Sequence, residues 1–176
     1  MAAVADDRFS ASVPASAPTG PAWLDDDERA TWLSLMAMMT RVPSALDAQL
    51  QRDAGLTFFE YMVLALLAEQ PDRRMRMSEL AAVTNGSPSR LSHVARRLEE
   101  QHFLERENDA VDGRYTNATL TDAGLAKVVA SAPGHVATAR SLVIDSLTKQ
   151  QLRQLRTAAD LVLVRVGGMQ APLPTE

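Results

Sequence analysis

The stretch that decides the fold is residues 78–101, SELAAVTNGSPSRLSHVARRLEEQ. A short helix is predicted over residues 79–83, and the dipeptide Asn85-Gly86 favours a turn directly after it. A second helix follows over residues 88–101 and begins with a proline, which suits the first helical position because no backbone N–H is needed there. Two helices joined by so short a turn predict a helix-turn-helix.

The second helix of this motif has two faces of different chemistry. Its apolar residues share one face and are suited to anchoring the helix on a core: Leu91, Val94, Ala95 and Leu98. Its polar front carries Ser89, Arg90, His93, Arg96 and Arg97. A helix with an apolar back and a front of this size fits the major groove of DNA.

The position of each polar residue along the helix suggests what it contacts. Ser89, Arg90 and His93 lie near the N-terminus, which is the end that usually reaches base edges. An arginine there can donate two hydrogen bonds to one guanine. Arg96 and Arg97 lie further along and suit phosphates, so they are expected to add salt-dependent affinity and little sequence information.

The charge is distributed unevenly along the chain. The 176 residues carry a net charge of −4, which excludes a uniformly basic nucleic-acid-binding protein. Residues 73–98, however, contain six arginines and a single acid, whereas residues 1–60 contain four arginines and nine acids. The negative total therefore hides a cationic stripe on the predicted DNA-contacting segment. The alternative is that the arginine-rich helix is only a solvated amphipathic helix.

A predicted β-hairpin follows the helix-turn-helix. Residues 103–107 and 115–120 alternate as two strands, and the tip between them contains Asp112, Gly113 and Arg114. Gly113 is expected to permit the tight turn, and Asp112 is placed to hold Arg114 extended through a local ion pair. An arginine fixed beside the second helix can enter the adjacent minor groove. The alternative is a surface hairpin whose charge pair contributes about 0–1 kcal/mol.

With these features, residues 28–163 resemble the MarR-type winged helix-turn-helix transcriptional regulators. The resemblance is strongest at SPSRLSHVARRLE (residues 87–99) and at DGRY (residues 112–115) followed by LTDAG (residues 120–124). It implies a mostly α fold with a small β wing, in which N- and C-terminal helices form a homodimer. Such a dimer is expected to bind a pseudo-palindromic site in double-stranded DNA, with its recognition helices about 34 Å apart.

The resemblance also extends to individual residues. Ser89, Arg90 and His93 match base-contacting positions, although a histidine departs from the residues expected there, and Arg114 matches the minor-groove residue of the wing. The full set predicted to contact DNA or to support that contact is Ser87, Ser89, Arg90, Ser92, His93, Arg96, Arg97, Arg106, Asp112 and Arg114.

The predicted organisation has five parts. They are a flexible arm (residues 1–22), an N-terminal dimerisation helix (residues 23–55), the winged helix-turn-helix domain (residues 56–122), C-terminal dimerisation helices (residues 123–168) and a frayed tail (residues 169–176). Pro43 and Pro133 fall inside predicted helices and are expected to kink or break them. The terminal helices carry apolar stripes that so small a domain cannot cover, which agrees with dimerisation.

The resemblance further implies a response to a small effector. Members of the family often sense phenolic or lipophilic molecules in a crevice between the dimerisation helices and the DNA-binding head. Trp32, Met36 and Tyr61 could line such a crevice. The alternative, which we favour for all three, is an ordinary place in the core or in the dimer interface.

Other chemistries lack the residues that they require. Cysteine is absent, which excludes disulfides, a thiolate nucleophile, cysteine-ligated zinc and cysteine-based redox sensing. No Gly-rich phosphate loop, nucleophile motif or metal-binding histidine spacing is present. We therefore expect a DNA-binding regulator, most simply a repressor, with no cofactor, metal or enzymatic activity. The alternatives are a winged-helix protein-interaction module and a small all-helical enzyme.

The expected location is the cytoplasm. The longest aliphatic runs are far shorter than a membrane span. The N-terminus carries Asp6 and Asp7 in place of the basic region of a secretory signal.

Overall fold

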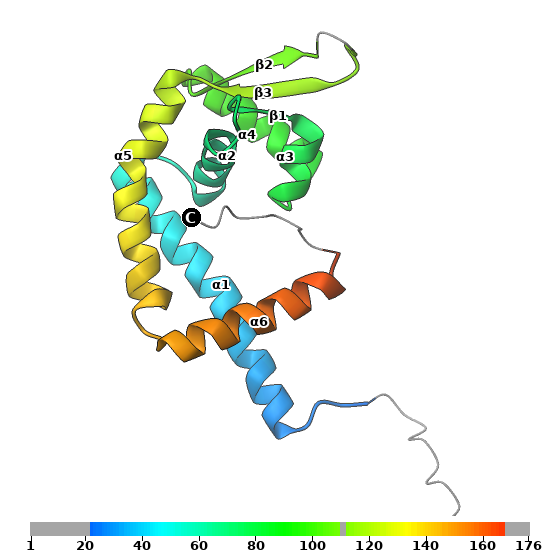
Figure 1. Ribbon diagram of the computed structural model, residues 1–176, viewed down its shortest axis with the longest axis vertical. Helices are drawn as coiled ribbons and strands as arrows, with labels where there is room; N and C mark the ends of the chain where they lie inside the picture. Colours follow the sequence, from blue (N-terminus) through cyan, green and yellow to red (C-terminus); the bar gives the residue numbers. More distant parts are fainter. Residues whose placement is uncertain (1–21, 110–111, 168–176) are drawn as a thin grey trace, which may run out of the picture. The chain divides into compact units, whose positions relative to one another are not determined.

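The computed structural model describes residues 22–109 and 112–167. Its elements, shown in Figure 1, are in chain order α1 (Asp26–Ala54), α2 (Phe58–Ala68), β1 (Arg74–Arg76), α3 (Met77–Val83), α4 (Pro88–Glu100), β2 (Leu104–Asn108), β3 (Thr116–Leu120), α5 (Asp122–Ala139), the π-helical turn η1 (Arg140–Ile144) and α6 (Lys149–Arg165). The prediction of a mostly helical chain with a small β wing is confirmed. The predicted arm (apart from residue 22) and the tail lie outside the described residues.

The chain divides within α1, after Met38, into two compact units. The first holds the N-terminal turns of α1, which begin at a reciprocal cap: Glu28 donates its backbone N–H to Asp25 Oδ1, and Asp25 donates its own to Glu28 Oε2. Acidic residues fill this first turn, where the helix dipole favours them. In this unit Trp32 and Leu33 stay 49% and 56% exposed.

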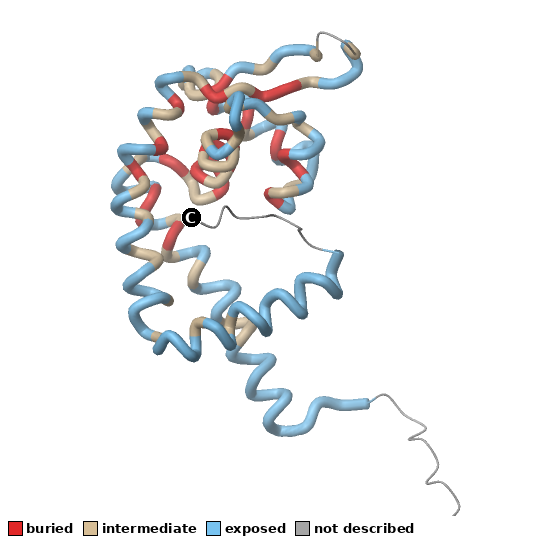
Figure 2. The backbone as a smooth tube through the Cα atoms, viewed as in Figure 1, coloured by how far each residue is buried: buried red, intermediate tan, exposed pale blue. Residues whose placement is uncertain are grey.

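The second unit holds the winged helix-turn-helix and the C-terminal helices. A hydrophobic core, drawn red in Figure 2, joins α2, α3, α4 and the sheet. Its fully buried members include Leu64 and Leu67 of α2, Leu80 of α3 and Leu98 of α4. Because α2 is apolar on most sides, core residues pack around most of it. The capping box between Thr57 and Glu60 fixes the start of this helix.

The sheet has three antiparallel strands in the order β1-β3-β2. Arg106 pairs with Ala118 across the β2–β3 hairpin, and Met75 pairs with Ala118 on the other side. Ala118 and Leu120 of the central strand are buried in the core. The hairpin is therefore anchored at its base, whereas its far end projects from the core as a wing (Figure 1).

Of the two effects expected of Pro43 and Pro133, a kink or a break, the break is wrong for both helices. α1 continues through Pro43, and α5 continues through Pro133 to Ala139. A proline removes one backbone hydrogen bond, but packing on both sides can hold a helix together across it. Leu46 and Leu50 are buried after Pro43, and Val128 is buried before Pro133. The irregularity comes later, at the π-helical turn η1.

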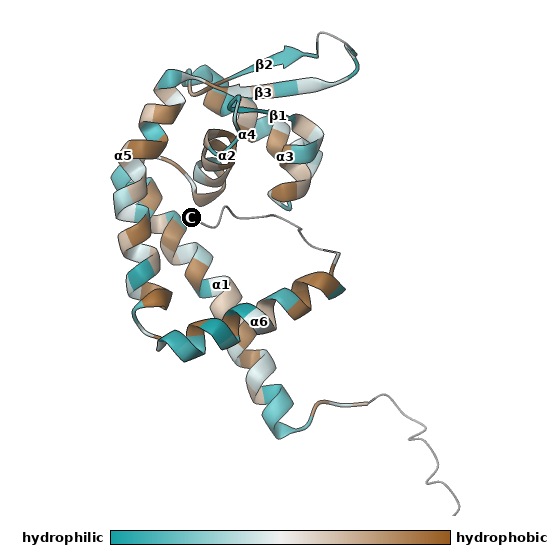
Figure 3. Ribbon diagram, in the orientation of Figure 1, coloured by the Kyte–Doolittle hydropathy of each residue, from teal (hydrophilic) through white to brown (hydrophobic). Residues whose placement is uncertain are grey.

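The C-terminal helix α6 has no buried residue. It begins at a capping box between Thr148 and Gln151, yet the apolar residues of its C-terminal half are exposed. Leu161 is 67% exposed and Val164 is 78% exposed, and Figure 3 shows the hydrophobic colour concentrated in the C-terminal half of the helix. So many exposed apolar side chains on one helix indicate a surface that a partner covers.

Candidate nucleic-acid interface

The turn between α3 and α4 sets the direction in which α4 begins. Asn85 takes a positive φ of 50°, a conformation that asparagine tolerates better than most residues. Ser87 then caps α4, because its hydroxyl accepts the backbone N–H of Arg90 at 3.2 Å. The Ser87 hydroxyl also lies 3.2 Å from the hydroxyl of Ser89. Ser87 and Ser89, two of the three predicted serines, thus stand at the exposed N-terminal end of α4.

The two predicted faces of α4 are confirmed. Leu91, Ala95 and Leu98 are buried. The exposed side carries six of the residues that were predicted to contact DNA: Ser89, Arg90, Ser92, His93, Arg96 and Arg97. The helix therefore presents a continuous cationic, hydrogen-bonding surface while its back is fixed in the core.

Two arginines of this surface have partners within the protein. An Nη atom of the Arg96 guanidinium lies 3.2 Å from Nδ1 of His93, and because a guanidinium can only donate, this imidazole nitrogen is the acceptor. Arg97 Nε lies 3.2 Å from Oε1 of Glu60 on α2, a carboxylate that is only 1% exposed. The other oxygen of Glu60 accepts the backbone N–H of Thr57, so one buried carboxylate joins the start of α2 to α4.

Arg90 is held in a different way. Its guanidinium carbon lies 4.1 Å from the centre of the Phe59 ring on α2, which is a cation–π contact. Within the described part of the chain, its guanidinium N–H groups donate no hydrogen bond. The contact with Phe59 thus orients the side chain and leaves all of its side-chain donors available.

Arg106 of β2 is held by Glu99 of α4. The carboxylate accepts the guanidinium at 2.6 and 3.1 Å and also accepts the backbone N–H of Arg106 at 3.1 Å. These hydrogen bonds hold the pKa of Glu99 below its usual value. Arg106 also lines a hollow of about 360 Å³ together with Ser92, His93 and Arg96. The structure therefore brings this predicted residue to the edge of the α4 surface.

The wing carries the predicted ion pair. Asp112 accepts the guanidinium of Arg114 at 2.9 and 2.7 Å and its backbone N–H at 3.2 Å. These bonds lower the pKa of Asp112 and raise that of Arg114. The Arg114 side chain remains 86% exposed. The wing residues Ala110 and Val111 lie outside the described residues.

The expected role of Gly113 in this turn is wrong. Positive φ is confined, among the described glycines, to Gly55 and Gly167, and a Cβ at Gly113 would meet nothing within 4 Å. The turn is held by polar contacts instead, since Tyr115 donates its N–H to the Asp112 carbonyl at 3.0 Å and Asp109 donates to the Tyr115 carbonyl at 2.8 Å.

Sequence reasoning missed three residues that shape this surface. They are Phe59 under Arg90, Glu60 beside Arg97, and Arg76 of β1, whose guanidinium lies 4.4 Å from the centre of the Tyr115 ring next to the tip of the wing. The spacing of Thr57 and Glu60 signals a capping box, but no local pattern predicts that Glu60 also meets α4. The other two contacts join segments far apart in the chain.

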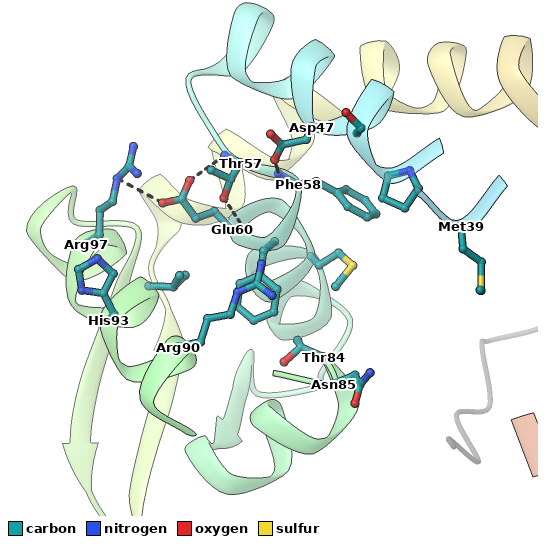
Figure 4. A pocket seen from close by; sticks show the side chains of 15 residues that line it. Met39, Asp47, Thr57, Phe58, Glu60, Thr84, Asn85, Arg90, His93 and Arg97 are labelled. Atoms are coloured by element: carbon teal, nitrogen blue, oxygen red, sulfur yellow. Dashed lines mark hydrogen bonds and ion pairs between the residues drawn. The ribbon is translucent and has the colours of Figure 1, made fainter. Parts of the chain in front are cut away.

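A cavity of about 880 Å³ opens beside α4 (Figure 4). Its apolar wall includes Met39, Pro43, Phe58, Met62 and Val94. Its polar groups come from α4, from the turn before it, from the start of α2 and from α1. Figure 4 shows Arg90 reaching across the cavity between His93 and Thr84. Asp47 lies at the far side, where it accepts the backbone N–H of Phe58 at 2.7 Å.

The three residues considered for an effector site lie elsewhere. Tyr61 is 8% exposed in the core, where its ring lies 4.5 Å from that of His135 on α5. Burial raises the pKa of Tyr61 and lowers that of His135. Trp32 and Met36 belong to the first compact unit. None of the three lines the cavity of Figure 4.

Residues 22–109 and 112–167 contain no group of three or more histidine, aspartate or glutamate side chains arranged to hold a metal ion. None of the helices in these residues is both long and apolar enough to cross a membrane.

Two solved regulators of Streptomyces coelicolor are similar to this chain. Sco3205, a MarR family transcriptional regulator crystallised in complex with DNA, is 40% identical; the match covers 82% of this chain and 94% of Sco3205, with a TM-score of 0.79. AbsC, another MarR family transcriptional regulator, is 36% identical; the match covers 85% of this chain and all of AbsC, with a TM-score of 0.80.

A family-level comparison gives the same result. The profile of the MarR family matches residues 54–114, the segment from the end of α1 to the wing arginine. A comparison with curated proteins finds no significant match.

Proposed function

The chain belongs to the MarR family of transcriptional regulators, and we propose that it represses transcription by binding a pseudo-palindromic DNA operator as a homodimer. The observation that carries this proposal is the exposed cationic front of α4 beside a wing whose arginine is fixed by an ion pair. Similarity to Sco3205, which was crystallised with DNA, supports the same activity. Because such a regulator has to reach the genome, we place it in the cytoplasm. We propose no enzymatic role for it.

The proposed contacts divide by position. Arg90 and His93, near the N-terminal end of α4, contact base edges in the major groove, and Ser89 assists them. Arg96 contacts phosphates, and Arg114 enters the minor groove beside them. The remaining members of the predicted set support these contacts through their positions around the same surface: Ser87, Ser92, Arg97, Arg106 and Asp112.

The proposed organisation assigns DNA binding to residues 56–122. Residues 23–55 and 123–168 form the dimer, because α6 leaves its apolar residues exposed and an isolated chain would gain by covering them. A two-fold dimer repeats the α4 surface once per half-site and explains why the operator should be nearly palindromic.

Selection of bound duplexes from a random DNA library at near-physiological salt tests this function. A pseudo-palindromic motif with half-sites about one helical turn apart is the expected result. Recovery of no motif, with only weak salt-sensitive binding, would overturn sequence-specific regulation and favour the alternative of a winged-helix protein-interaction module.

Replacing Arg114 tests the wing. Arg114→Ala is expected to weaken binding to the selected operator about tenfold, because a groove contact of this kind contributes about 1–3 kcal/mol. The matched variant Arg114→Lys keeps the positive charge but loses the planar guanidinium that donates two hydrogen bonds to the Asp112 carboxylate. An affinity between those of the wild type and Arg114→Ala is therefore expected. Affinities come from fluorescence anisotropy at one salt concentration. Unchanged affinity of Arg114→Ala with an unchanged melting curve would remove the wing from the interface.

We further propose that the cavity beside α4 takes a small effector that releases the DNA. The cavity has an apolar wall, and the Arg90 guanidinium reaches across it with no carboxylate partner in the described chain. An aromatic carboxylate satisfies both features, because its ring fits the apolar wall and its anion pairs with the arginine. Such a molecule would hold Arg90 away from a base and so compete with the operator.

Matched pairs of ligands test this site. Benzoate and naphthoates are expected to raise the melting temperature of the DNA-free dimer and to release the operator, whereas the corresponding carboxamides should do neither. Equal effects of the acid and the amide would contradict pairing with Arg90. No effect of either would mean that the cavity does not take this class of molecule.

A further inference from the structure

The contact between Phe59 and Arg90 joins a core residue to the DNA-contacting surface. Phe59 lies in the first turn of α2 and is 8% exposed, whereas Arg90 lies on the exposed front of α4. The guanidinium carbon stands 4.1 Å from the ring centre. Arg90 therefore rests on the flat face of a ring that the core itself fixes.

The turn before α4 is shaped around the same ring. A Cβ built on Gly86 would lie 2.8 Å from Cζ and 3.3 Å from Cε2 of Phe59. Gly86 does not have a positive φ, so the lack of a side chain matters here for space and not for backbone conformation. The ring thus packs under both the turn and the first turn of α4, and its own position is tightly constrained.

The other arginines of this surface are oriented by polar partners, which occupy some of their donors. Arg97 is paired with Glu60, Arg106 with Glu99, and Arg96 with His93. Arg90 is oriented through its flat face instead, and in the described residues no acceptor takes its guanidinium N–H groups. An arginine held in this way loses less side-chain freedom on binding and can still donate two hydrogen bonds to a guanine.

We propose that Phe59 is a specificity-determining positioning residue: its ring holds the Arg90 guanidinium ready for a base edge, although Phe59 itself does not touch DNA. The inference rests on the proposed function, because it requires that Arg90 contacts a base. It predicts that removing the ring changes base preference at the position that Arg90 contacts and leaves the rest of the motif unchanged.

The experiment compares the full-length dimer with Phe59→Leu, Arg90→Ala and the double variant, using the selected operator and its single-base substitutions. Arg90→Ala should flatten the preference at one symmetric pair of positions. Phe59→Leu should lower discrimination at the same pair about three- to fivefold, the factor that matches a partly exposed cation–π contact. In the Arg90→Ala background, Phe59→Leu should cause no further loss there.

Two further variants separate positioning from folding. Phe59→Met fills the space of the ring without its π face, so it should repeat the loss of discrimination even if Phe59→Leu melts too early to be assayed. Phe103→Leu is the matched control, because its ring lies under Lys127, with 5.8 Å between the ammonium and the ring centre, and not under α4. It should keep the full motif.

The outcomes distinguish the role of Phe59 from the base contact of Arg90. If Arg90→Ala flattens one position while Phe59→Leu and Phe59→Met retain it, the role of Phe59 is overturned and DNA recognition by Arg90 stands. If Arg90→Ala leaves the motif unaltered, the base contact of Arg90 is overturned, and the role of Phe59 falls with it. If Phe59→Leu weakens binding to all sequences equally, and by the same factor whether or not Arg90 is present, the role of Phe59 in positioning is overturned and Phe59 only stabilises the fold.

Discussion

Introducing two aspartates into the apolar face of α6, Leu161→Asp with Val164→Asp, is expected to convert the dimer to a monomer. Both side chains are more than half exposed in the single chain, and they lie three residues apart on one side of the helix. In a dimer they would be buried, and an unpaired carboxylate buried in an apolar interface is strongly unfavourable. The monomer would then bind one half-site, so operator affinity should fall by about 10²- to 10⁴-fold.

Analytical ultracentrifugation gives the oligomeric state, and anisotropy with a full operator and a single half-site gives the affinities. The double variant should bind the half-site about as well as the wild-type protein does, because the α4 surface and the wing are unchanged. Gln150→Asp serves as the control, since it places an acid in the first turn of α6, where the helix dipole favours it. A double variant that remains a dimer at low micromolar concentration would show that α6 does not supply the interface.

Local sequence patterns predicted the parts of the site that depend on local geometry. The period of apolar residues in α4 determines which side faces the core, and this side is fixed whatever the helix packs against. The pair Asp112 and Arg114 lies two residues apart, so its ion pair also follows from the chain alone. The hairpin follows for the same reason, because both strands and their turn are contiguous in the chain.

The contacts that local patterns did not predict join distant segments. Glu60 and Arg97 are 37 positions apart, and Phe59 and Arg90 are 31 apart, so only the packing of α2 against α4 brings them together. The positions of the prolines led to a wrong prediction because a local pattern does not show the tertiary packing that can hold a helix together. Pro133 should end an isolated helix, but in the folded chain α5 packs on α2 through His135 and Val128, and this packing outweighs one lost hydrogen bond.

Gly124 is a glycine whose role becomes clear only in the structure. It is the last residue of LTDAG and lies in the first turn of α5, buried against the chain that leaves α4. A Cβ on Gly124 would lie 2.0 Å from the carbonyl oxygen of Phe103 and 2.9 Å from its carbonyl carbon. That carbonyl is not free to move, because it accepts the N–H of Thr121, while the Thr121 hydroxyl donates to the carbonyl of His102.

Gly124→Ala is therefore expected to destabilise the protein by about 3 kcal/mol, because the clash with fixed backbone exceeds the gain of about 1 kcal/mol that alanine brings to a helix. For a chain of this length that loss corresponds to a melting temperature about 6–12 °C lower. Gly113→Ala is the matched control and should change stability by less than about 0.5 kcal/mol, since its Cβ would meet no atom within 4 Å. Thermal melts at one protomer concentration measure both. A Gly124→Ala variant as stable as the wild type would mean that the start of α5 can move away from the Phe103 carbonyl.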